Sequence, residues 1–368
     1  MKRTLISLAL VWACALDMHA ADADSLSARG EHAYEGPEIE RFSVETRMGW
    51  KMQRTGGVTD DSRTGFRGEY INMYLHARLY KGLSFRWRQR LNITNERNFW
   101  DSTDYMMMQY EPNRHWQIAA GKQVVAIGGY EYDRPAIDLY YNTEYWNQIP
   151  CFQLGASVAY TFNSGDRLML QLSNSPFRKA IGNNNTYGLS LMWTGVHGPW
   201  ETIWSANAFQ TTGGRWINYI VLGNRLNLLP EGRLWLEADF INRASSRQTF
   251  FFQDCSVAAE LSGRPHPAVR LFAKYTYDRN HSGTDADQCV TDGTEIHGIG
   301  GGVEYEPFRR YPNVLRLYGV ANYSTGTNAN PDGALQDGLV CVNIGIKVNL
   351  DILQGLRWAL KKRGTDPQ

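Results

Sequence analysis

Apolar and polar residues alternate with a period of two along most of the chain. In the segment 83–93, for example, Leu83, Phe85 and Trp87 alternate with Arg86 and Arg88. Successive side chains of a strand point to opposite faces, so this alternation predicts half-buried β-strands. We expect sixteen strands, near 41–52, 71–79, 83–93, 104–111, 115–123, 152–162, 167–173, 186–194, 200–210, 216–227, 233–243, 249–261, 268–278, 295–305, 314–323 and 339–350.

The connections between the expected strands alternate between short and long. Short connections such as 81–82 are separated by longer ones such as 124–151, with 211–215 and 244–248 as exceptions. Outer-membrane β-barrels have short periplasmic turns, longer external loops and an even number of strands. A closed barrel also pairs every backbone N–H and C=O within hydrocarbon. The pattern therefore favours an all-β, sixteen-stranded antiparallel transmembrane barrel over a soluble secreted protein of several sheets.

Composition and charge agree with this fold class. The chain has 12 Trp, 20 Tyr, 14 Phe and 35 Gly, which is far from a disordered composition. The 38 Lys and Arg nearly balance the 37 Asp and Glu, which argues against a nucleic-acid partner. After residue 20 no stretch offers the ~18 consecutive apolar residues of a membrane-spanning helix.

The N-terminus has the features of a secretory signal peptide over residues 1–23. Lys2 and Arg3 precede an apolar stretch that ends near Leu16, and Ala21-Asp22-Ala23 offers a cleavage site. We therefore expect export to the outer membrane of a Gram-negative bacterium, where the barrel would contact lipid. The expected layout is a signal peptide at 1–23, a periplasmic segment at 24–38, the barrel at 39–350 and a C-terminal helix and tail at 351–368.

The last part of the chain predicts a short amphipathic helix at 351–363. Asp351 can cap its start, and Ile352, Leu353 and Leu356 repeat at helical spacing on one face. The sequence leaves open whether this helix lies at the periplasmic rim or in the lumen.

Sixteen strands enclose a lumen wide enough for water, so we expect the polar faces to line a channel. Arg86, Arg88 and Arg90, which we call the arginine ladder, project to one face at intervals of roughly 7 Å. Guanidinium groups suit phosphate and carboxylate oxygens. The alternative is that such residues merely solvate the lumen and pair with nearby acids. The expected anion path comprises Arg41, Arg47, Lys51, Arg78, Arg86, Arg88 and Arg90.

An acidic wall is expected opposite these bases, together with an acidic loop. The wall comprises Glu201, Glu237 and Asp239, with Asp254 and Glu260 beside them. The connection 124–151, which we call the inner loop, is too long for an idle connection. We expect a helix in it, capped by Asp133 and running to Trp146, and we expect Lys122 either to pair with Glu131 or Asp133 or to line the pore. The charged residues expected at the constriction are Lys122, Glu131, Asp133, Arg134, Asp138 and Glu144.

The stretch 119–151 resembles the phosphate-selective porin O/P family, in the form found in Bacteroidetes outer membranes. Gly121-Lys122-Gln123 followed by Gly128-Gly129-Tyr130-Glu131 is the most specific part, and Ile137-Asp138, Tyr140 and Cys151-Phe152 extend it. The resemblance implies a passive channel of sixteen strands, usually a homotrimer, with a loop folded into the pore. It does not establish phosphate as the solute.

The sequence therefore predicts an outer-membrane porin for small hydrophilic solutes with a mild anion preference, phosphate being one candidate. A non-conducting structural or secretion-associated barrel is the alternative. A barrel enzyme is less favoured, because the chain has no GxSxG, HExxH or P-loop pattern. We expect no cofactor and no metal, and the pairing of Cys151, Cys255, Cys289 and Cys341 is left open.

Overall fold

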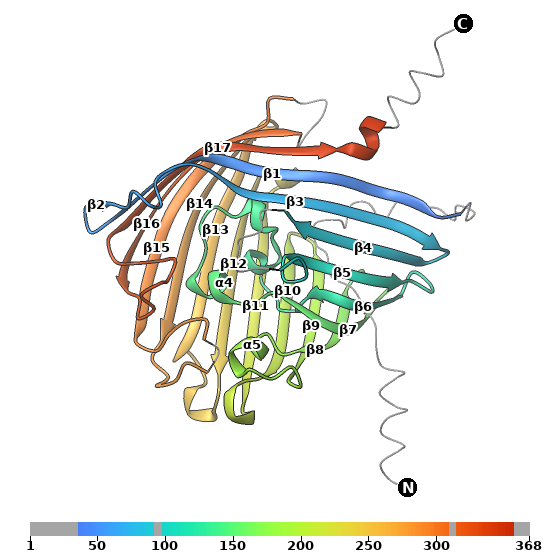
Figure 1. The fold of residues 1–368 in the computed structure, drawn as a ribbon, viewed down its shortest axis with the longest axis horizontal. Helices are drawn as coiled ribbons and strands as arrows, with labels where there is room; N and C mark the ends of the chain where they lie inside the picture. Colours follow the sequence, from blue (N-terminus) through green and yellow to red (C-terminus); the bar gives the residue numbers. More distant parts are fainter. Residues whose placement is uncertain (1–35, 92–97, 287, 309–313, 357–368) are drawn as a thin grey trace, which may run out of the picture.

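The structure, a computed structural model, describes residues 36–91, 98–286, 288–308 and 314–356. Its strands close into one antiparallel barrel in which each strand pairs with the next along the chain, and β17 pairs with β1 (Figure 1). Sixteen long strands and the two-residue β2 make up the sheet in the described part of the chain, which confirms the expected barrel. The strands are β1 (Glu38–Thr55), β2 (Val58–Thr59), β3 (Gly65–Tyr80), β4 (Leu83–Arg90), β5 (Thr103–Tyr110), β6 (Trp116–Val124), β7 (Phe152–Thr161), β8 (Arg167–Asn174), β9 (Tyr187–His197), β10 (Trp200–Gln210), β11 (Trp216–Leu229), β12 (Leu234–Ala244), β13 (Asp254–His266), β14 (Val269–Asn280), β15 (Thr294–Tyr305), β16 (Leu315–Thr327) and β17 (Leu339–Asp351).

Short helical turns occupy some of the connections. Three lie in the inner loop, which spans 125–151 in the structure. The helical elements are α3 (Tyr130–Asp133), η1 (Ala136–Asp138), α4 (Glu144–Gln148), α5 (Arg178–Ile181), η2 (Thr212–Gly214), η3 (Pro230–Gly232) and η4 (Arg247–Thr249). No helix of the described residues is long and apolar enough to cross a membrane.

Two expected strands begin at the wrong residue, and one of them is β3, which starts at Gly65 and not at 71. We expected a strand at 249–261, but β13 begins only at Asp254. Phe251 and Phe252, which look like strand residues, adopt φ of 56° and 58°, outside the extended region. The connection between β12 and β13 is therefore longer than the 244–248 expected.

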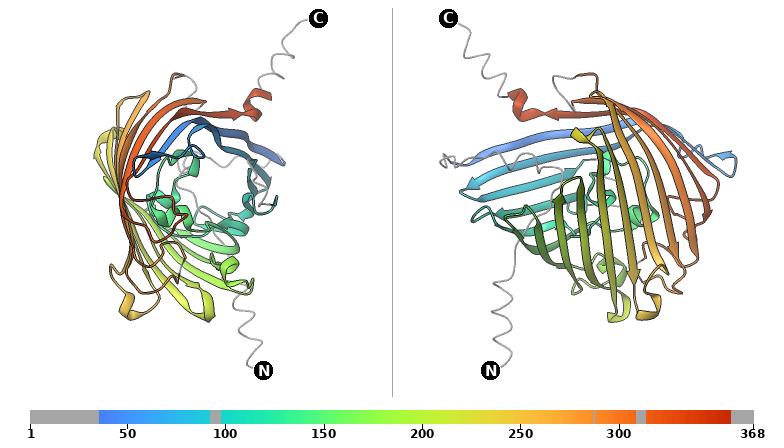
Figure 2. Two further views of the ribbon diagram at one scale, coloured as in Figure 1. Left: turned by 60° about the vertical axis from the view of Figure 1, so that its left-hand side comes forward. Right: turned by 180° about the vertical axis from the view of Figure 1, so that it is seen from behind.

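The alternation of side chains gives the barrel an apolar outside and a mainly polar inside. On β8, Leu168, Leu170 and Leu172 are exposed, whereas Gln171 and Ser173 are buried. The inner loop fills part of the lumen, as Figure 2 (left) shows, and Val125, Ala126 and Ile127 are fully buried. A core cluster inside the barrel joins this loop to the wall made by β10–β12.

We expected a signal peptide at one chain end and a helix at the other, and the structure describes only part of these two segments. The expected signal peptide at 1–23 lies outside the described residues. At the other end a helix begins at 352 and is described to 356, and the N–H of Gln354 donates to Asp351 Oδ1 at 2.8 Å, as expected for a cap. The rest of the expected helix, 357–363, is not part of the description.

Barrel closure depends on a pair of glycines that face each other at the seam. Gly49 on β1 pairs with Gly345 on β17, and Tyr318 of β16 lies over both. A Cβ on Gly345 would lie 2.3 Å from the carbonyl oxygen of Met48 and 2.6 Å from the hydroxyl of Tyr318. The tyrosine therefore covers the seam only because neither strand carries a side chain there.

We expect Gly345→Ala to lower the stability of the folded barrel by about 1–3 kcal/mol, since the added methyl group forces backbone or ring shifts. The gel-shift temperature at which the barrel unfolds in detergent measures this. Gly68→Ala is the matched control, because nothing lies within 4 Å of a Cβ at Gly68. Equal unfolding temperatures for the two variants would contradict the role of the seam.

Candidate functional site

The inner loop is held against one side of the barrel, formed by β10–β17, which we call the long wall. Side chains of this wall accept hydrogen bonds from the backbone amides of the loop. Asp239 of β12 accepts from the N–H groups of Tyr130 and Glu131 at 2.8 and 2.6 Å. Asp278 of β14 accepts from the N–H of Glu144 at 2.7 Å. Backbone amides inside a barrel have little other means of pairing, so these carboxylates fix the course of the loop.

Glycines let the loop approach the wall closely. A Cβ on Gly223 of β11 would lie 2.6 Å from Gly129 Cα, and a Cβ on Gly128 would lie 2.5 Å from the carbonyl oxygen of Ile203. The Gly128-Gly129 pair, which carries the family resemblance, therefore marks the point at which the loop turns onto the strands.

The expectation of one helix from Asp133 to Trp146 is wrong. Asp133 ends α3 instead of capping a helix, η1 follows, and α4 begins only at Glu144 with Thr143 as its cap. Between the turns the chain bends at Tyr140 and Tyr141, whose side chains reach different parts of the wall. Tyr140 donates to Glu304 at 2.5 Å, and Tyr141 donates to the carbonyl of Lys274.

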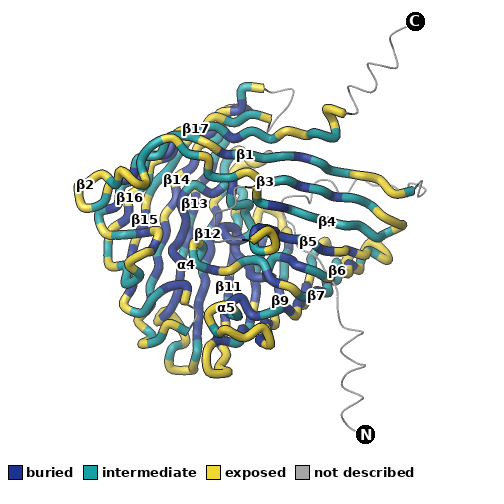
Figure 3. The backbone as a smooth tube through the Cα atoms, viewed as in Figure 1, coloured by how far each residue is buried: buried dark blue, intermediate teal, exposed yellow. Residues whose placement is uncertain are grey.

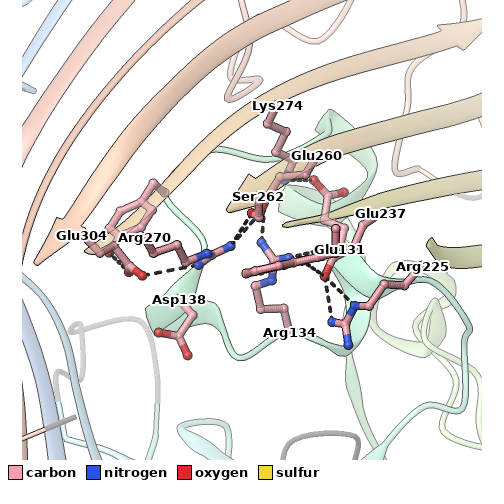
Figure 4. Close-up of polar contacts among 12 residues, drawn as sticks. Glu131, Arg134, Asp138, Arg225, Glu237, Glu260, Ser262, Arg270, Lys274 and Glu304 are labelled. Atoms are coloured by element: carbon pink, nitrogen blue, oxygen red, sulfur yellow. Dashed lines mark hydrogen bonds and ion pairs between the residues drawn. The ribbon is translucent and has the colours of Figure 1, made fainter. Parts of the chain in front are cut away.

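A belt of acidic and basic residues runs across the long wall, and Figure 4 shows its central part. Arg134 and Asp138 of the loop insert where two neighbouring wall residues carry like charges. Arg134 of the loop pairs with Glu237 and, at 2.8 Å, with Glu260. Arg270 continues the belt from Glu260 at 2.6 Å to Glu304 at 3.4 Å. Eight consecutive strands, β10–β17, each contribute one member. These members are Glu201, Arg225, Glu237, Glu260, Arg270, Glu304, Arg316 and Lys347.

The wall expected to be acidic is therefore neutralised. We expected Glu201, Glu237 and Asp239 there but not the bases on neighbouring strands. Arg225 pairs with both Glu201 and Glu237, at 3.1 and 2.7 Å. Four bases lie at alternating positions that face inward like the acids, and this alternation could have revealed them from the sequence. They are Arg225, Arg270, Arg316 and Lys347.

The acids of the inner loop are likewise paired with the wall and do not form an open acidic face. Glu131 binds Lys274 at 2.7 Å. Glu144 is fully buried and accepts from the backbone N–H groups of Ala334 and Leu335 at 2.9 and 3.1 Å. Asp138 binds Lys347, and Arg316 at 3.2 Å.

Lys122 neither pairs with Glu131 or Asp133 nor lines the pore. Its cross-strand neighbours are Met106 and Leu154, and the latter is exposed on the outer face. The Nζ of Lys122 donates to the carbonyl of Trp100 at 2.7 Å. Gly121 before it has a φ of 132°, but the pairing of β6 with β5 and β7 runs through both residues without a register shift.

The expected bases on β1 and β3 are partly neutralised as well. Arg41 pairs with Glu45 at 3.0 Å, and Arg78 pairs with Glu38 at the start of β1. Arg47 binds Glu69 at 2.6 Å, and it also donates to the loop carbonyl groups of Ile137 and Leu139 at 2.9 and 2.6 Å.

Lys51 differs from the other expected bases of β1. It has no hydrogen-bond or ion-pair partner within the described part of the chain. The bases of β1 and β3 thus serve local pairing, loop docking and, in Lys51, an unpaired charge.

The arginine ladder on β4 carries the clearest local excess of positive charge. Arg88 Nε and Arg90 Nε lie 2.7 and 2.8 Å from the two oxygens of a single carboxylate, Asp104. Their guanidinium carbons lie 5.2 and 5.9 Å from the ring centre of Phe152. The terminal Nη atoms of both arginines have no hydrogen-bond partner among the described residues. Arg86 stands on the same face, opposite His76 and Met107.

The histidines and cysteines offer no evident catalytic group in this part of the structure. His76 is buried and its Nε2 lies 3.3 Å from the hydroxyl of Tyr105. The four described cysteines are free thiols, and burial raises the pKa of Cys151 to about 11. Across the described ranges no group of three or more His, Cys, Asp or Glu is arranged to hold a metal ion.

A closed sixteen-stranded barrel with a folded loop docked inside it defines the class of the porin-type outer-membrane proteins. Among solved structures, the chain resembles an anion-selective porin from Comamonas acidovorans, with a TM-score of 0.61, 13% identity, and coverage of 85% of this chain and all of the other. It also resembles OmpT of Vibrio cholerae (TM-score 0.58, 11% identity, 87% and 99% coverage). The outer-membrane channel DcaP of Acinetobacter baumannii is a third relative in fold (TM-score 0.56, 11% identity, 87% and 99% coverage).

Residues 42–208, from β1 to β10, match the family model of the phosphate-selective porins O and P. This match includes 119–151 and confirms the resemblance expected from that stretch. The match and the fold together support an outer-membrane porin. The family and the fold point to a channel rather than an enzyme. No curated protein matches the chain in sequence.

The docking of the inner loop through Asp138 predicts an acid-dependent change. Burial alone would raise the pKa of this carboxyl, but Lys347 and Arg316 outweigh it and hold the pKa below the usual 3.8. A pKa lower in the docked than in the released loop means that protonation favours release. The stabilisation is complete above about pH 3.8 and is lost as the pH falls through the lower, docked value.

We therefore expect single-channel conductance to be constant at neutral pH and to rise or become noisy only below pH 3.8. Asp138→Asn should weaken docking by about 1.5–3 kcal/mol, since the loop loses its charge-assisted contacts with Lys347 and Arg316, which keep Glu304 as a partner. The variant should show the noisy state already at neutral pH and a smaller acid step. An acid profile identical to that of the wild type would show that Asp138 does not hold the loop.

Proposed function

We propose that the barrel is a passive diffusion channel for small hydrophilic solutes with a mild preference for anions. The observation that carries the proposal is the shared carboxylate of Asp104, which leaves two inward-facing guanidinium groups with one negative charge between them. Asp104 also binds each arginine at Nε, so that the terminal nitrogens remain available to a passing oxyanion. The long wall adds little to this preference, because its acids and bases are paired.

The inner loop confines the solute path in this proposal. Its backbone and acids are bound to β10–β17, while the arginine ladder stands on β4. Solutes would therefore pass between the loop and the wall that carries the ladder. Seven basic residues are proposed as members of this path, with Arg88 and Arg90 as its selective part. They are Arg41, Arg47, Lys51, Arg78, Arg86, Arg88 and Arg90.

The remaining parts of the proposal rest on the family. We propose export by the signal peptide at 1–23 and residence in the outer membrane of a Gram-negative bacterium. A homotrimer is proposed because one solved form of Vibrio cholerae OmpT is described as a trimer. The mass of the detergent-solubilised protein checks this assembly.

Arg88, Arg90 and Asp104 form a cluster, which we call the Asp104 cluster. We expect removal of its acid and removal of its bases to shift the ion selectivity in opposite directions. Asp104→Asn removes the single acid and leaves the trio at net +2, so the reversal potential in a salt gradient should move toward greater anion selectivity. The double variant Arg88→Gln, Arg90→Gln leaves Asp104 alone at −1 and should move it toward cations. Arg215→Gln, at an exposed position between β10 and β11, is the matched control. Shifts of the same sign, or none, would place the cluster outside the conduction path.

We expect removal of residues 130–147 to raise conductance and to admit larger sugars in a liposome-swelling assay. The physical reason is that this segment occupies the lumen, with Tyr145 and Glu144 buried against the wall. Glu237, Glu260 and Glu304 each keep a partner on neighbouring strands after the deletion. Retained heat resistance of the folded band controls for barrel integrity. An unchanged conductance in an intact barrel would mean that the loop does not limit the pore.

A further inference from the structure

The connection between β12 and β13 carries three consecutive phenylalanines on the outside of the barrel. Phe250, Phe251 and Phe252 are 36%, 66% and 59% exposed. The ring of Phe252 lies 5.4 Å from that of Phe240 on β12. Phe240 faces outward, because its cross-strand neighbour on β11 is the exposed Leu222. The three rings therefore extend the lipid-facing surface at the external end of these strands, where the tips of the connections are exposed (Figure 3).

The backbone beneath these rings adopts a conformation that bulky residues avoid. Phe251 and Phe252 have φ of 56° and 58°, in the left-handed region. The conformation is held in place by the N–H of Phe252, which donates to Asn242 Oδ1 at 3.1 Å, and by the N–H of Ser246, which donates to Thr249 Oγ1 at 3.0 Å. Unfavourable backbone angles kept by surrounding contacts are characteristic of functional segments.

A polar group lies beside the phenylalanines on the same outer face. Arg279 of β14 stands opposite Cys255 of β13, and its Nη2 lies 3.2 Å from His281 Nδ1. His281 Nε2 lies 3.4 Å from Glu295 of β15. Arg247, in the same connection as the phenylalanines, is exposed and has no ion pair or side-chain hydrogen bond in the described ranges. The connection and the neighbouring strand ends thus carry two arginines and a histidine against one carboxylate.

The height of this group on the barrel matches a membrane surface. Arg279 is the last residue but one of β14, and Glu295 is the second residue of β15. Further along β15, on the same face, Ile299 and Val303 are 61% and 41% exposed. The charges therefore lie where the apolar band ends, which is the level of lipid headgroups.

We propose that Phe251 and Phe252, with Arg247 and Arg279, form a binding site for one anionic lipid of the outer leaflet. Its acyl chains pack against the phenylalanine rings, and its phosphate groups lie beside the guanidinium groups. A lipid is the occupant that fits, because Phe252 packs directly on the lipid-facing Phe240 and the cations stand at the edge of the same band. The site is independent of the solute path, which lies on the inner face.

Native mass spectrometry of the full-length barrel tests the proposal. Diphosphoryl lipid A, monophosphoryl lipid A and phosphatidylcholine are the three probes, each titrated into the detergent-solubilised protein. Phe251→Asn removes one ring and keeps a residue that accepts a left-handed φ. The double variant Arg247→Gln, Arg279→Gln removes the cations. Phe162→Asn and Arg114→Gln, both exposed near periplasmic turns, are the matched controls.

We expect the wild type to bind diphosphoryl lipid A more tightly than monophosphoryl lipid A, and both more tightly than phosphatidylcholine. Phe251→Asn should weaken binding of both forms of lipid A on the order of tenfold, as expected for loss of a buried aromatic ring. The double arginine variant should abolish the preference for the second phosphate. The unfolding temperature of Phe251→Asn in detergent should be unchanged or raised, because the strain is relieved.

Three results would overturn the proposal. The first is equal binding of diphosphoryl lipid A and phosphatidylcholine by the wild type. The second is a loss of binding in the control variants as large as in the site variants. The third is a Phe251→Asn protein that binds lipid A normally but unfolds at lower temperature or loses self-association, which would assign the rings to folding or to a second copy of the chain.

Discussion

The need to pair every backbone N–H and C=O inside a membrane shapes both the barrel and the loop within it. The strands satisfy this requirement by closing the sheet between β1 and β17. The inner loop satisfies it differently, because its amides are capped by carboxylates that project from the wall, such as Asp239 and Asp278. These two inward-facing acids consequently serve architecture and are not available to attract solutes.

Charge pairing follows from the same enclosure. A loop that carries Glu131, Asp138 and Glu144 into a lumen lined with acids is stable only if the wall supplies bases at matching positions. Lys274 and Lys347 do so, and the belt from Glu201 to Lys347 leaves the long wall close to neutral. In the channel that we propose, selectivity therefore depends on the opposite side, where Arg88 and Arg90 share Asp104.

The outer surface of the barrel carries two kinds of exposed residues. Its exposed large hydrophobic residues are mostly leucine, isoleucine and aromatic side chains that need only contact lipid. The segment 250–252 differs, because it displays aromatic rings on a backbone that is costly for them and lies beside Arg279. Alternate residues of each strand face the lumen and the lipid. The residues that line the pore and those that contact the membrane can therefore vary independently.

The sequence by itself determined the number of strands, their approximate bounds and the side to which most residues point, because period-two alternation is a local property of the chain. It also indicated which connection was too long to be a simple turn. The tertiary structure alone decided which charges neutralise one another. Arg134 pairs with Glu237 and Glu260, which are more than a hundred residues away in sequence. Arg225 pairs with Glu201 on the adjacent strand. A local break in the pattern was also beyond the sequence: Phe251 and Phe252 adopt left-handed angles, and β13 begins only at Asp254. Such pairings and breaks depend on strand register and backbone conformation, which the alternation of residue types does not encode.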